Sequence, residues 1–128
     1  MPPAVILLVE DEAAIREVIE AVLEAEGYRV VSTVDGADAL DVLRDGLRPC
    51  MIILDLMMPV MDGRAFREAQ EREPRLAGIP LLVMSADAGI EFKALNIGVR
   101  DYLKKPIDLE TVLAKVKSFE VGDRDARK

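Results

Sequence analysis

Acidic residues stand directly after two short apolar segments of this sequence. Glu10 and Asp11 follow Ala4–Val9, and Asp55 follows Met51–Leu54. Both segments are too short and too uniformly apolar to be amphipathic helices, and they are typical of strands buried on both faces. An isolated aspartate at a strand end often only opens a turn, and Asp55 taken alone fits that role. Together with the acids after the first segment, it indicates a shared acidic site at one edge of a parallel sheet.

Three carboxylates in one crevice need a positive partner. At a separation of ~5 Å and an effective dielectric constant of ~20, each pair of negative charges repels by about 3 kcal/mol. A hard divalent cation with oxygen ligands is the natural partner. Mg2+ in particular takes one or two carboxylates and keeps positions for water and phosphate oxygens. A Ca2+ cage needs more ligands, and the sequence shows no loop that would supply them. The acidic residues therefore predict a Mg2+ site.

A hydroxyl and a lysine occupy equivalent positions after two later segments. Ser85 follows the apolar segment Leu81–Met84, and Lys105 comes after the more mixed segment Val99–Leu103. A lysine can balance the charge of a phosphate, and a hydroxyl can contact one of its oxygens. With Mg2+ at the carboxylates, these residues predict a phosphoryl-transfer site in which Asp55 is the nucleophile.

Composition narrows the function further. The chain has 128 residues, which corresponds to one domain with a conventional core. Its 17 Lys and Arg against 24 Asp and Glu give a net charge of -7, and this charge opposes binding to a nucleic-acid backbone. The absence of histidine excludes His-based catalytic triads, His metal ligands and a phosphohistidine role.

The cysteine count and the first apolar segment bear on localisation. Cys50 is the single cysteine and cannot form an internal disulfide, and its place before an apolar strand predicts a small buried side chain. A protein whose only cysteine forms no internal disulfide is typical of a reducing compartment. The segment 4–9 is too short for a signal peptide or a membrane span. We therefore expect a cytoplasmic protein.

Strand and helix patterns alternate about five times along the chain, which predicts an α/β sandwich with a parallel sheet. The expected strands are residues 4–9, 29–33, 51–54, 81–84 and 99–103. The expected helices are residues 12–26, 37–45, 64–73, 90–97 and a last one from about 109. Residues 1–120 are expected to form one domain, followed by a charged, disordered tail at 121–128.

The polarity of the strands predicts their order in the sheet. The first, third and fourth strands are apolar on both faces and belong in the middle, whereas the second and fifth are mixed and belong at the edges. The order 2-1-3-4-5 satisfies this with short right-handed crossovers, as in doubly wound, flavodoxin-like folds. Such sheets bind ligands beyond the carboxyl ends of the strands, at the point between the first and third strands where the order reverses. The acidic residues lie at that point.

Four segments, in their order along the chain, resemble the receiver domain of two-component response regulators, the CheY-like family. They are Val9–Glu12, Leu54–Gly63, Met84–Ala86 and Tyr102–Pro106. The resemblance extends from Ala4 to about Phe119 and implies a phosphorylation-dependent signalling switch. It departs from the common family pattern at two positions, where Glu10 replaces Asp and Ser85 replaces Thr.

The resemblance also implies a role for each site residue. Asp55 would accept a phosphoryl group from a partner histidine kinase or phosphotransfer protein. Glu10 and Asp11, with Asp55 itself and the Met57 backbone carbonyl, would hold Mg2+. The chain would assist only its own phosphorylation and dephosphorylation, so it would not be a turnover enzyme.

The remaining site residues would respond to the phosphoryl group. Lys105 would pair with the phosphate and Ser85 would contact a phosphoryl oxygen. In the family, movement of this hydroxyl is coupled to burial of the aromatic residue at Tyr102.

Strand alternation predicts which residues of the fifth strand share a face. Val99, Leu103 and Lys105 are expected on one face, and Arg100, Tyr102 and Lys104 on the other. Lys104 is then a solvated lysine that points away from the site. The surface around Tyr102 is the expected docking face for a downstream protein, although an exposed edge tyrosine without a partner is the simpler alternative.

Two other functions fit parts of the pattern. An aspartyl-phosphate hydrolase normally carries a second acid two positions after its nucleophile, where this chain has Met57, and it uses a cap domain that is missing here. A receiver that only binds partners would have lost an acid, the hydroxyl or the lysine, and all of these are present. The sequence leaves open the kinase, the output, a phosphorylation-dependent dimer, and whether the chain stands alone or belongs to a longer regulator with an effector domain.

Overall fold

The computed structural model describes residues 4–58, 60–99 and 101–126, with side chains described as far as residue 119. Five parallel strands form one sheet in the order β2-β1-β3-β4-β5, as the strand polarity predicted. The strands are β1 (Val5–Val9), β2 (Arg29–Thr33), β3 (Met51–Asp55), β4 (Leu81–Ser85) and β5 (Asp101–Lys104).

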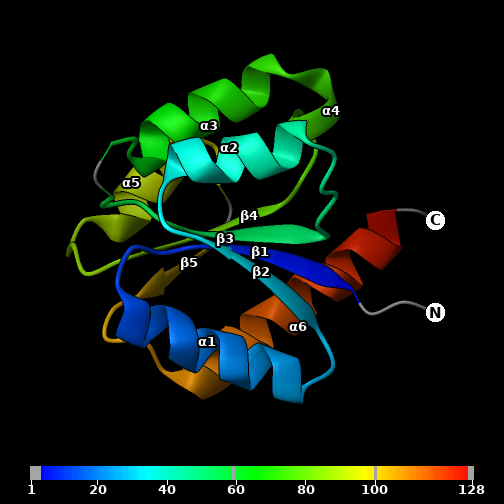
Figure 1. Cartoon of the computed structure of the whole chain (residues 1–128). Helices are drawn as coiled ribbons and strands as arrows, with labels where there is room; N and C mark the ends of the chain where they lie inside the picture. The colour runs from blue at the N-terminus through cyan, green and yellow to red at the C-terminus, as the bar shows by residue number, and fades with distance from the viewer. Residues whose placement is uncertain (1–3, 59, 100, 127–128) are drawn as a thin grey trace.

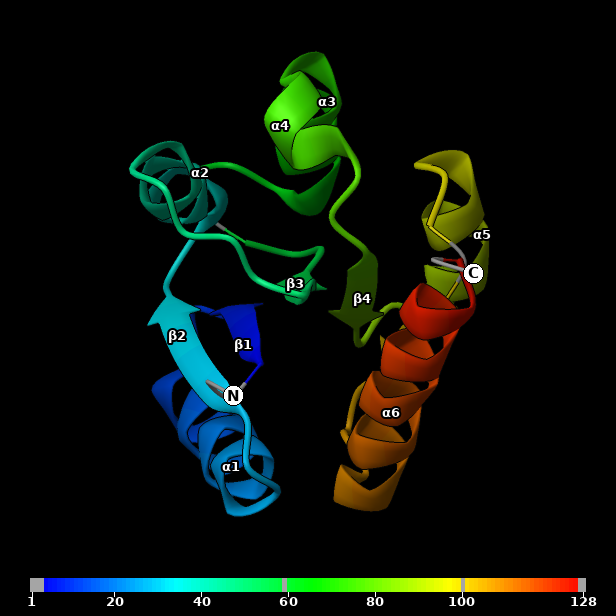
Figure 2. The same ribbon diagram turned by 90° about the vertical axis from the view of Figure 1, so that its right-hand side faces the viewer.

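Helices cover both faces of the sheet (Figures 1 and 2). They are α1 (Ala13–Ala25), α2 (Gly36–Arg44), α3 (Gly63–Arg72), α4 (Pro74–Ala77), α5 (Ile90–Asn96) and α6 (Leu109–Ala126). In the views of Figures 1 and 2, α1 and α6 lie below the sheet and α2, α3 and α4 above it, with α5 beside β4 and β5. The fold is the expected doubly wound sandwich.

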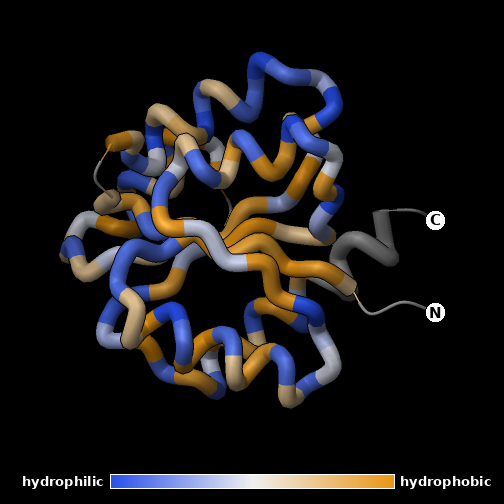
Figure 3. The backbone as a smooth tube through the Cα atoms, in the orientation of Figure 1, coloured by the Kyte–Doolittle hydropathy of each residue, from blue (hydrophilic) through white to orange (hydrophobic). Residues whose placement is uncertain are grey.

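Each face of the sheet has its own hydrophobic core. Leu7, Ile52 and Val83 point toward the side of α2–α5, and the neighbouring strand residues Ile6, Ile53 and Leu82 point toward α1 and α6. Because both faces are covered, every residue of β3 and β4 is buried. The hydropathy tube of Figure 3 shows the strands largely in orange between helices of mixed colour.

Two helix boundaries differ from the sequence prediction. Pro74 does not simply end α3, since it stands at the first position of the short helix α4, where its missing N–H does no harm. The backbone of α6 continues to Ala126, where a disordered tail was expected, and residues 127 and 128 lie outside the described part of the chain. The domain boundary at 120–121 itself stays a prediction.

Two residues lie elsewhere than predicted. Val99 packs into the core on the side of α5, whereas Leu103 packs into the core of α1 and α6, so they do not share a face. Strand alternation does not extend to Val99, because β5 begins only at Asp101. The face predicted for Arg100 falls outside the described residues. Cys50 is exposed and not buried, because it precedes the first residue of β3.

Within the part of the chain that the structure describes, no helix is long and apolar enough to cross a membrane.

Candidate functional site

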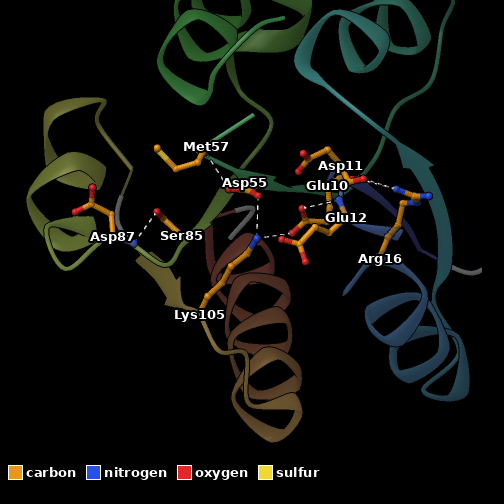
Figure 4. Close-up of polar contacts among 9 residues, drawn as sticks. All are labelled: Glu10, Asp11, Glu12, Arg16, Asp55, Met57, Ser85, Asp87 and Lys105. Atoms are coloured by element: carbon orange, nitrogen blue, oxygen red, sulfur yellow. Dashed lines mark hydrogen bonds and ion pairs between the residues drawn. The ribbon is translucent and has the colours of Figure 1, made fainter. Parts of the chain in front are cut away.

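The strand register brings the sequence-predicted residues to one edge of the sheet. Val9 is paired with Leu54, so the residues that follow β1 lie beside Asp55, the last residue of β3. On the other side, Ser85 is paired with Lys104, which places Lys105 immediately beyond the end of β5. Figure 4 shows the side chains of these strand ends converging from separate elements.

The three acids are close enough to share one cation. Glu10, Asp11 and Asp55 each offer a carboxylate oxygen, and these oxygens lie within 4.8 Å of one another. Glu10 and Asp55 are buried, with 0% and 2% of their surface exposed, whereas Asp11 is exposed. The Oε1 atom of Glu10 is buried without an aligned hydrogen bond from the described residues. A hard divalent cation would satisfy this oxygen, so the donor set fits Mg2+.

Lys105 connects two of the acids. Its Nζ lies 2.8 Å from Glu10 Oε1 and 2.9 Å from Asp55 Oδ2. Burial by itself lowers the pKa of Lys105, but the contacts with Glu10 and Asp55 outweigh burial and raise that pKa. The ammonium group therefore stays charged and partly offsets the negative charge of the site.

The carboxyl of Glu10 is held in an unfavourable environment for a charge. Burial raises its pKa to about 7, and the neighbouring Asp55 also raises it, against the lowering effects of Lys105 and of the Glu12 N–H. That N–H donates to Glu10 Oε2 at 3.2 Å.

Both interpretations of Asp55 are realised in the structure. Its Oδ1 accepts a hydrogen bond of 2.9 Å from the Met57 N–H, which is the turn contact expected of a strand-end aspartate. Its Oδ2 faces Lys105 in the acidic site. The Met57 side chain is 61% exposed.

Ser85 is buried at the end of β4, with its hydroxyl engaged by the loop that follows. Its Oγ accepts a hydrogen bond of 3.1 Å from the Asp87 N–H (Figure 4). The Asp87 carboxylate in turn contacts Lys93 Nζ and the Gly89 N–H, each at 2.6 Å. Lys93 first, and then the Gly89 N–H, lower the pKa of Asp87. The loop thus holds the hydroxyl by its backbone and is itself tied to α5.

The two remaining residues of the prediction lie as strand alternation suggests. Lys104 is exposed. Tyr102 is half-buried against the core on the side of α5, on the opposite face from Leu103, and Lys115 Nζ lies 5.9 Å from its ring centroid.

Several contacts at the site were not predicted from the sequence. Arg16 reaches the backbone beside the acids, and Asp87 and Lys93 support Ser85. Asp87 stands in an Asp-Ala-Gly turn that the sequence does display. Arg16 has no comparable signal, because an arginine in an amphipathic helix usually lies in solvent.

Comparisons with known proteins agree with this geometry. The sequence matches the family model of the response regulator receiver domain over residues 6–117. It is 38% identical over 116 residues to the DNA-binding dual master transcriptional regulator RpaA of Synechocystis sp., covering 89% of this chain and 48% of that protein. The chain thus spans about half the length of the curated relatives it matches.

Solved structures show the same architecture. The chemotaxis response regulator CheY4 of Vibrio cholerae superposes with a TM-score of 0.82 at 30% identity, covering 91% of this chain and 98% of that chain. The receiver domain of the sensor histidine kinase PA1611 from Pseudomonas aeruginosa gives a TM-score of 0.82 at 29% identity, covering 91% and 97% of the two chains. In that structure a magnesium ion is coordinated in the active-site cleft.

Proposed function

Because the chain belongs to the response regulator receiver domain family, whose members act as phosphorylation-dependent signalling switches, we propose that Asp55 is its phosphoacceptor. The observation that carries this assignment is the convergence of two further acids and Lys105 on the buried carboxylate of Asp55. Such a site can neutralise a transferred phosphoryl group.

The proposed metal ligands are the carboxylates of Glu10, Asp11 and Asp55 with the backbone carbonyl of Met57. Mg2+ bound there would offset the negative charge that gathers on the phosphoryl oxygens during transfer. The mutual closeness of the three acids supports this donor set, as does Glu10 Oε1, which is ion-paired with Lys105 but receives no aligned hydrogen bond from the described residues.

The protein's own residues then act in a defined order. An oxygen of Asp55 forms a bond to phosphorus while the phosphorus–nitrogen bond of the donor phosphohistidine breaks. Lys105, which pairs with Asp55 Oδ2 before transfer, is close enough to pair with the phosphoryl group afterwards. The Ser85 hydroxyl, whose oxygen accepts from the Asp87 N–H, would donate its O–H to a phosphoryl oxygen. The chain assists these steps on itself and turns over no separate substrate.

We expect the donor to be a histidine kinase or a phosphotransfer protein, and the output to be a protein that docks on the surface around Tyr102. The net charge of -7 argues against direct nucleic-acid binding by these residues, so any such activity would belong to an effector domain outside them. A phosphorylation-dependent dimer is a further expectation. The cytoplasm is the expected site of action, because a single cysteine fits a reducing compartment.

Intact-mass analysis with a small phosphoramidate donor tests the assignment of Asp55. The wild-type chain with Mg2+ should gain one phosphoryl group, and the gain should vanish in Asp55→Asn or when EDTA removes the metal. Asp41→Asn is a matched control, because Asp41 is exposed on α2 and should not affect labelling. Labelling that persists in Asp55→Asn would show that another residue accepts the phosphoryl group.

A further inference from the structure

The guanidinium group of Arg16 contacts the backbone of residues 10–12, which we term the acidic turn. Its Nη1 lies 2.9 Å from the Glu10 carbonyl oxygen and 3.5 Å from that of Asp11. Figure 4 shows Arg16 extending to this turn from α1, on the side away from Lys105. One nitrogen of a helix residue thus serves the carbonyls of two proposed Mg2+ ligands.

The acidic turn needs such support because it lies where the sheet ends. The Glu10 N–H makes a ladder-type hydrogen bond to the Thr33 carbonyl at 3.1 Å, and β1 itself ends one residue earlier. In a continuing strand, Glu10 and Asp11 would point to opposite faces. Both instead bring a carboxylate oxygen within 4.8 Å of Asp55, so the backbone has to turn away from strand geometry at this point.

Arg16 is itself anchored from its other side. Its Nε lies 3.9 Å from Glu20 Oε1, one helical turn further along α1, and Glu20 Oε1 accepts a hydrogen bond of 2.8 Å from the Ser32 hydroxyl of β2. The Arg16 side chain is only 20% exposed. A continuous set of contacts therefore runs from β2 through α1 to the acidic turn.

We propose that Arg16 is a positioning residue for the Mg2+ site, which holds the acidic turn in the conformation that directs Glu10 and Asp11 toward Asp55. The inference rests on the proposed function, since it presumes Mg2+ at these acids. Arg16 touches neither the metal nor the phosphoryl group in this role. It acts through the two carbonyls.

Whether removal of Arg16 strengthens or weakens Mg2+ binding distinguishes a positioning role of Arg16 from an effect of its charge alone. If Arg16 contributed only its positive charge, removing it would leave the site more negative and Mg2+ would bind more tightly. If Arg16 holds the turn, removing it lets Glu10 and Asp11 drift apart and Mg2+ binds more weakly. Outer contacts that orient metal ligands typically change metal affinity by about 10-fold or more.

The experiment is a Mg2+ titration of the full chain, followed by the amide NMR signals of residues 10–12. Arg16→Ala should raise the dissociation constant about 10-fold, and Arg16→Lys, which keeps the charge but loses the planar fork, should raise it by a smaller factor. Arg44→Ala is the matched control, because it also removes an arginine that is ion-paired with a glutamate, here Glu73 at 3.1 Å. It should change the constant less than about two-fold.

A second measurement keeps the test valid if Arg16→Ala folds poorly. Glu20→Asp keeps the charge and leaves Arg16 in place but shortens the side chain that anchors it, and it should also weaken Mg2+ binding. At saturating Mg2+, the rate of phosphoramidate labelling in these variants should return to within about two-fold of wild type, because Asp55 and Lys105 are unchanged.

Each outcome decides the matter. Weaker Mg2+ binding with recovery of labelling at saturating Mg2+ supports the positioning role. Unchanged or tighter Mg2+ binding in Arg16→Ala and Glu20→Asp overturns the positioning role while leaving the proposed function intact. A wild-type chain that binds no Mg2+ overturns both, and that result is distinguished by the wild-type titration alone.

Discussion

Lys105 lies between two buried carboxylates, and before phosphorylation its ammonium group offsets their charge. It is 2.8 Å from Glu10 Oε1 and 2.9 Å from Asp55 Oδ2, with 13% of its side chain exposed. Mg2+ would take over part of this neutralisation when it binds, because it engages the same acids. Lys105 is then free to meet a phosphoryl group, which links its two roles to the state of the site.

Lys105→Ala should lower the unfolding free energy of the metal-free chain by about 3 kcal/mol, because two buried acids lose their paired cation. Protonation of Glu10 would relieve part of this loss. Mg2+ should still bind and should restore more stability to the variant than to the wild type, although the conformational response to phosphorylation should be lost. Urea denaturation with EDTA or Mg2+ measures the stability effect.

Lys104→Ala provides the matched control for this prediction. Lys104 is the preceding residue, equal in charge and exposed, and its loss should change the unfolding free energy by less than about 0.5 kcal/mol. Equal losses in the two variants would mean that Lys105 stabilises the fold no more than a surface lysine does.

At the scale of elements, residues 56–62 join β3 to α3. Asp62 caps the helix by accepting a hydrogen bond of 2.9 Å from the Ala65 N–H. The Gly63 N–H donates to the Leu56 carbonyl at 3.2 Å. The position of the Met57 backbone thus depends on a tight approach between Gly63 and Leu56.

Gly63→Ala should therefore destabilise the chain and displace this loop. A Cβ at Gly63 would overlap the Leu56 side chain and lie 2.9 Å from Leu56 Cα, and the backbone cannot move aside as a flexible side chain can. We expect a loss of about 1–3 kcal/mol in unfolding free energy and weaker Mg2+ binding. Denaturation and Mg2+ titration of the same sample measure both.

Gly78→Ala is the corresponding control. It lies after α4 with an ordinary φ of -85°, and a Cβ there would meet nothing within 4 Å. The unfolding free energy of this variant should equal that of the wild type or be slightly higher, because alanine restricts the conformations of the unfolded chain. If Gly63→Ala behaved in the same way, the close packing of the loop would not constrain the site.

At the scale of the whole molecule, the proposed switch requires that phosphorylation of the site alters α5 and β5. To move the domain from about 1:99 to 99:1 in favour of its active state, phosphorylation must favour that state by about 5.5 kcal/mol. Charge-assisted contacts from Ser85 and Lys105 to the phosphoryl group can supply energy of that order. The Ser85 oxygen accepts from the Asp87 N–H, which leaves its own O–H to donate to a phosphoryl oxygen. If the hydroxyl moves to make that contact, the Asp87 loop is displaced with it, and this loop is tied to α5 through Lys93.

Phosphorylation, or a beryllofluoride mimic, should therefore shift NMR signals from Asp87 to Asn96 and at Tyr102. These positions lie beyond the metal site, and Tyr102 packs against the core that α5 also covers. Asp55→Asn should abolish all shifts, and Ser85→Ala should abolish those at Tyr102 while sparing the acidic turn. Shifts confined to the neighbours of Asp55, or a Tyr102 response that survives Ser85→Ala, would exclude this route of coupling.

The sequence alone was sufficient for the sheet and for the edge at which the site lies. Uniformly apolar strands must be covered on both faces, which places β1, β3 and β4 in the middle and the mixed strands at the edges. Side chains at the carboxyl ends of neighbouring parallel strands then meet, so Glu10, Asp11 and Asp55 could be brought together before any coordinates were known. The four segments that resemble receiver domains, in their order along the chain, also indicated the family.

Tertiary structure decided the contacts that depend on the packing of distant segments. The pairing of Lys105 with both Glu10 and Asp55 joins residues that are far apart in the sequence, and its geometry follows from the sheet register and side-chain packing. The hydrogen bond from the Asp87 N–H to Ser85 also depends on packing. So does the contact of Arg16 with the Glu10 carbonyl, because Arg16 resembles an ordinary surface arginine until α1 packs beside the end of β1. Cys50 and Val99 were misplaced because each lies just outside a strand, where alternation and burial patterns no longer fix the direction of a side chain.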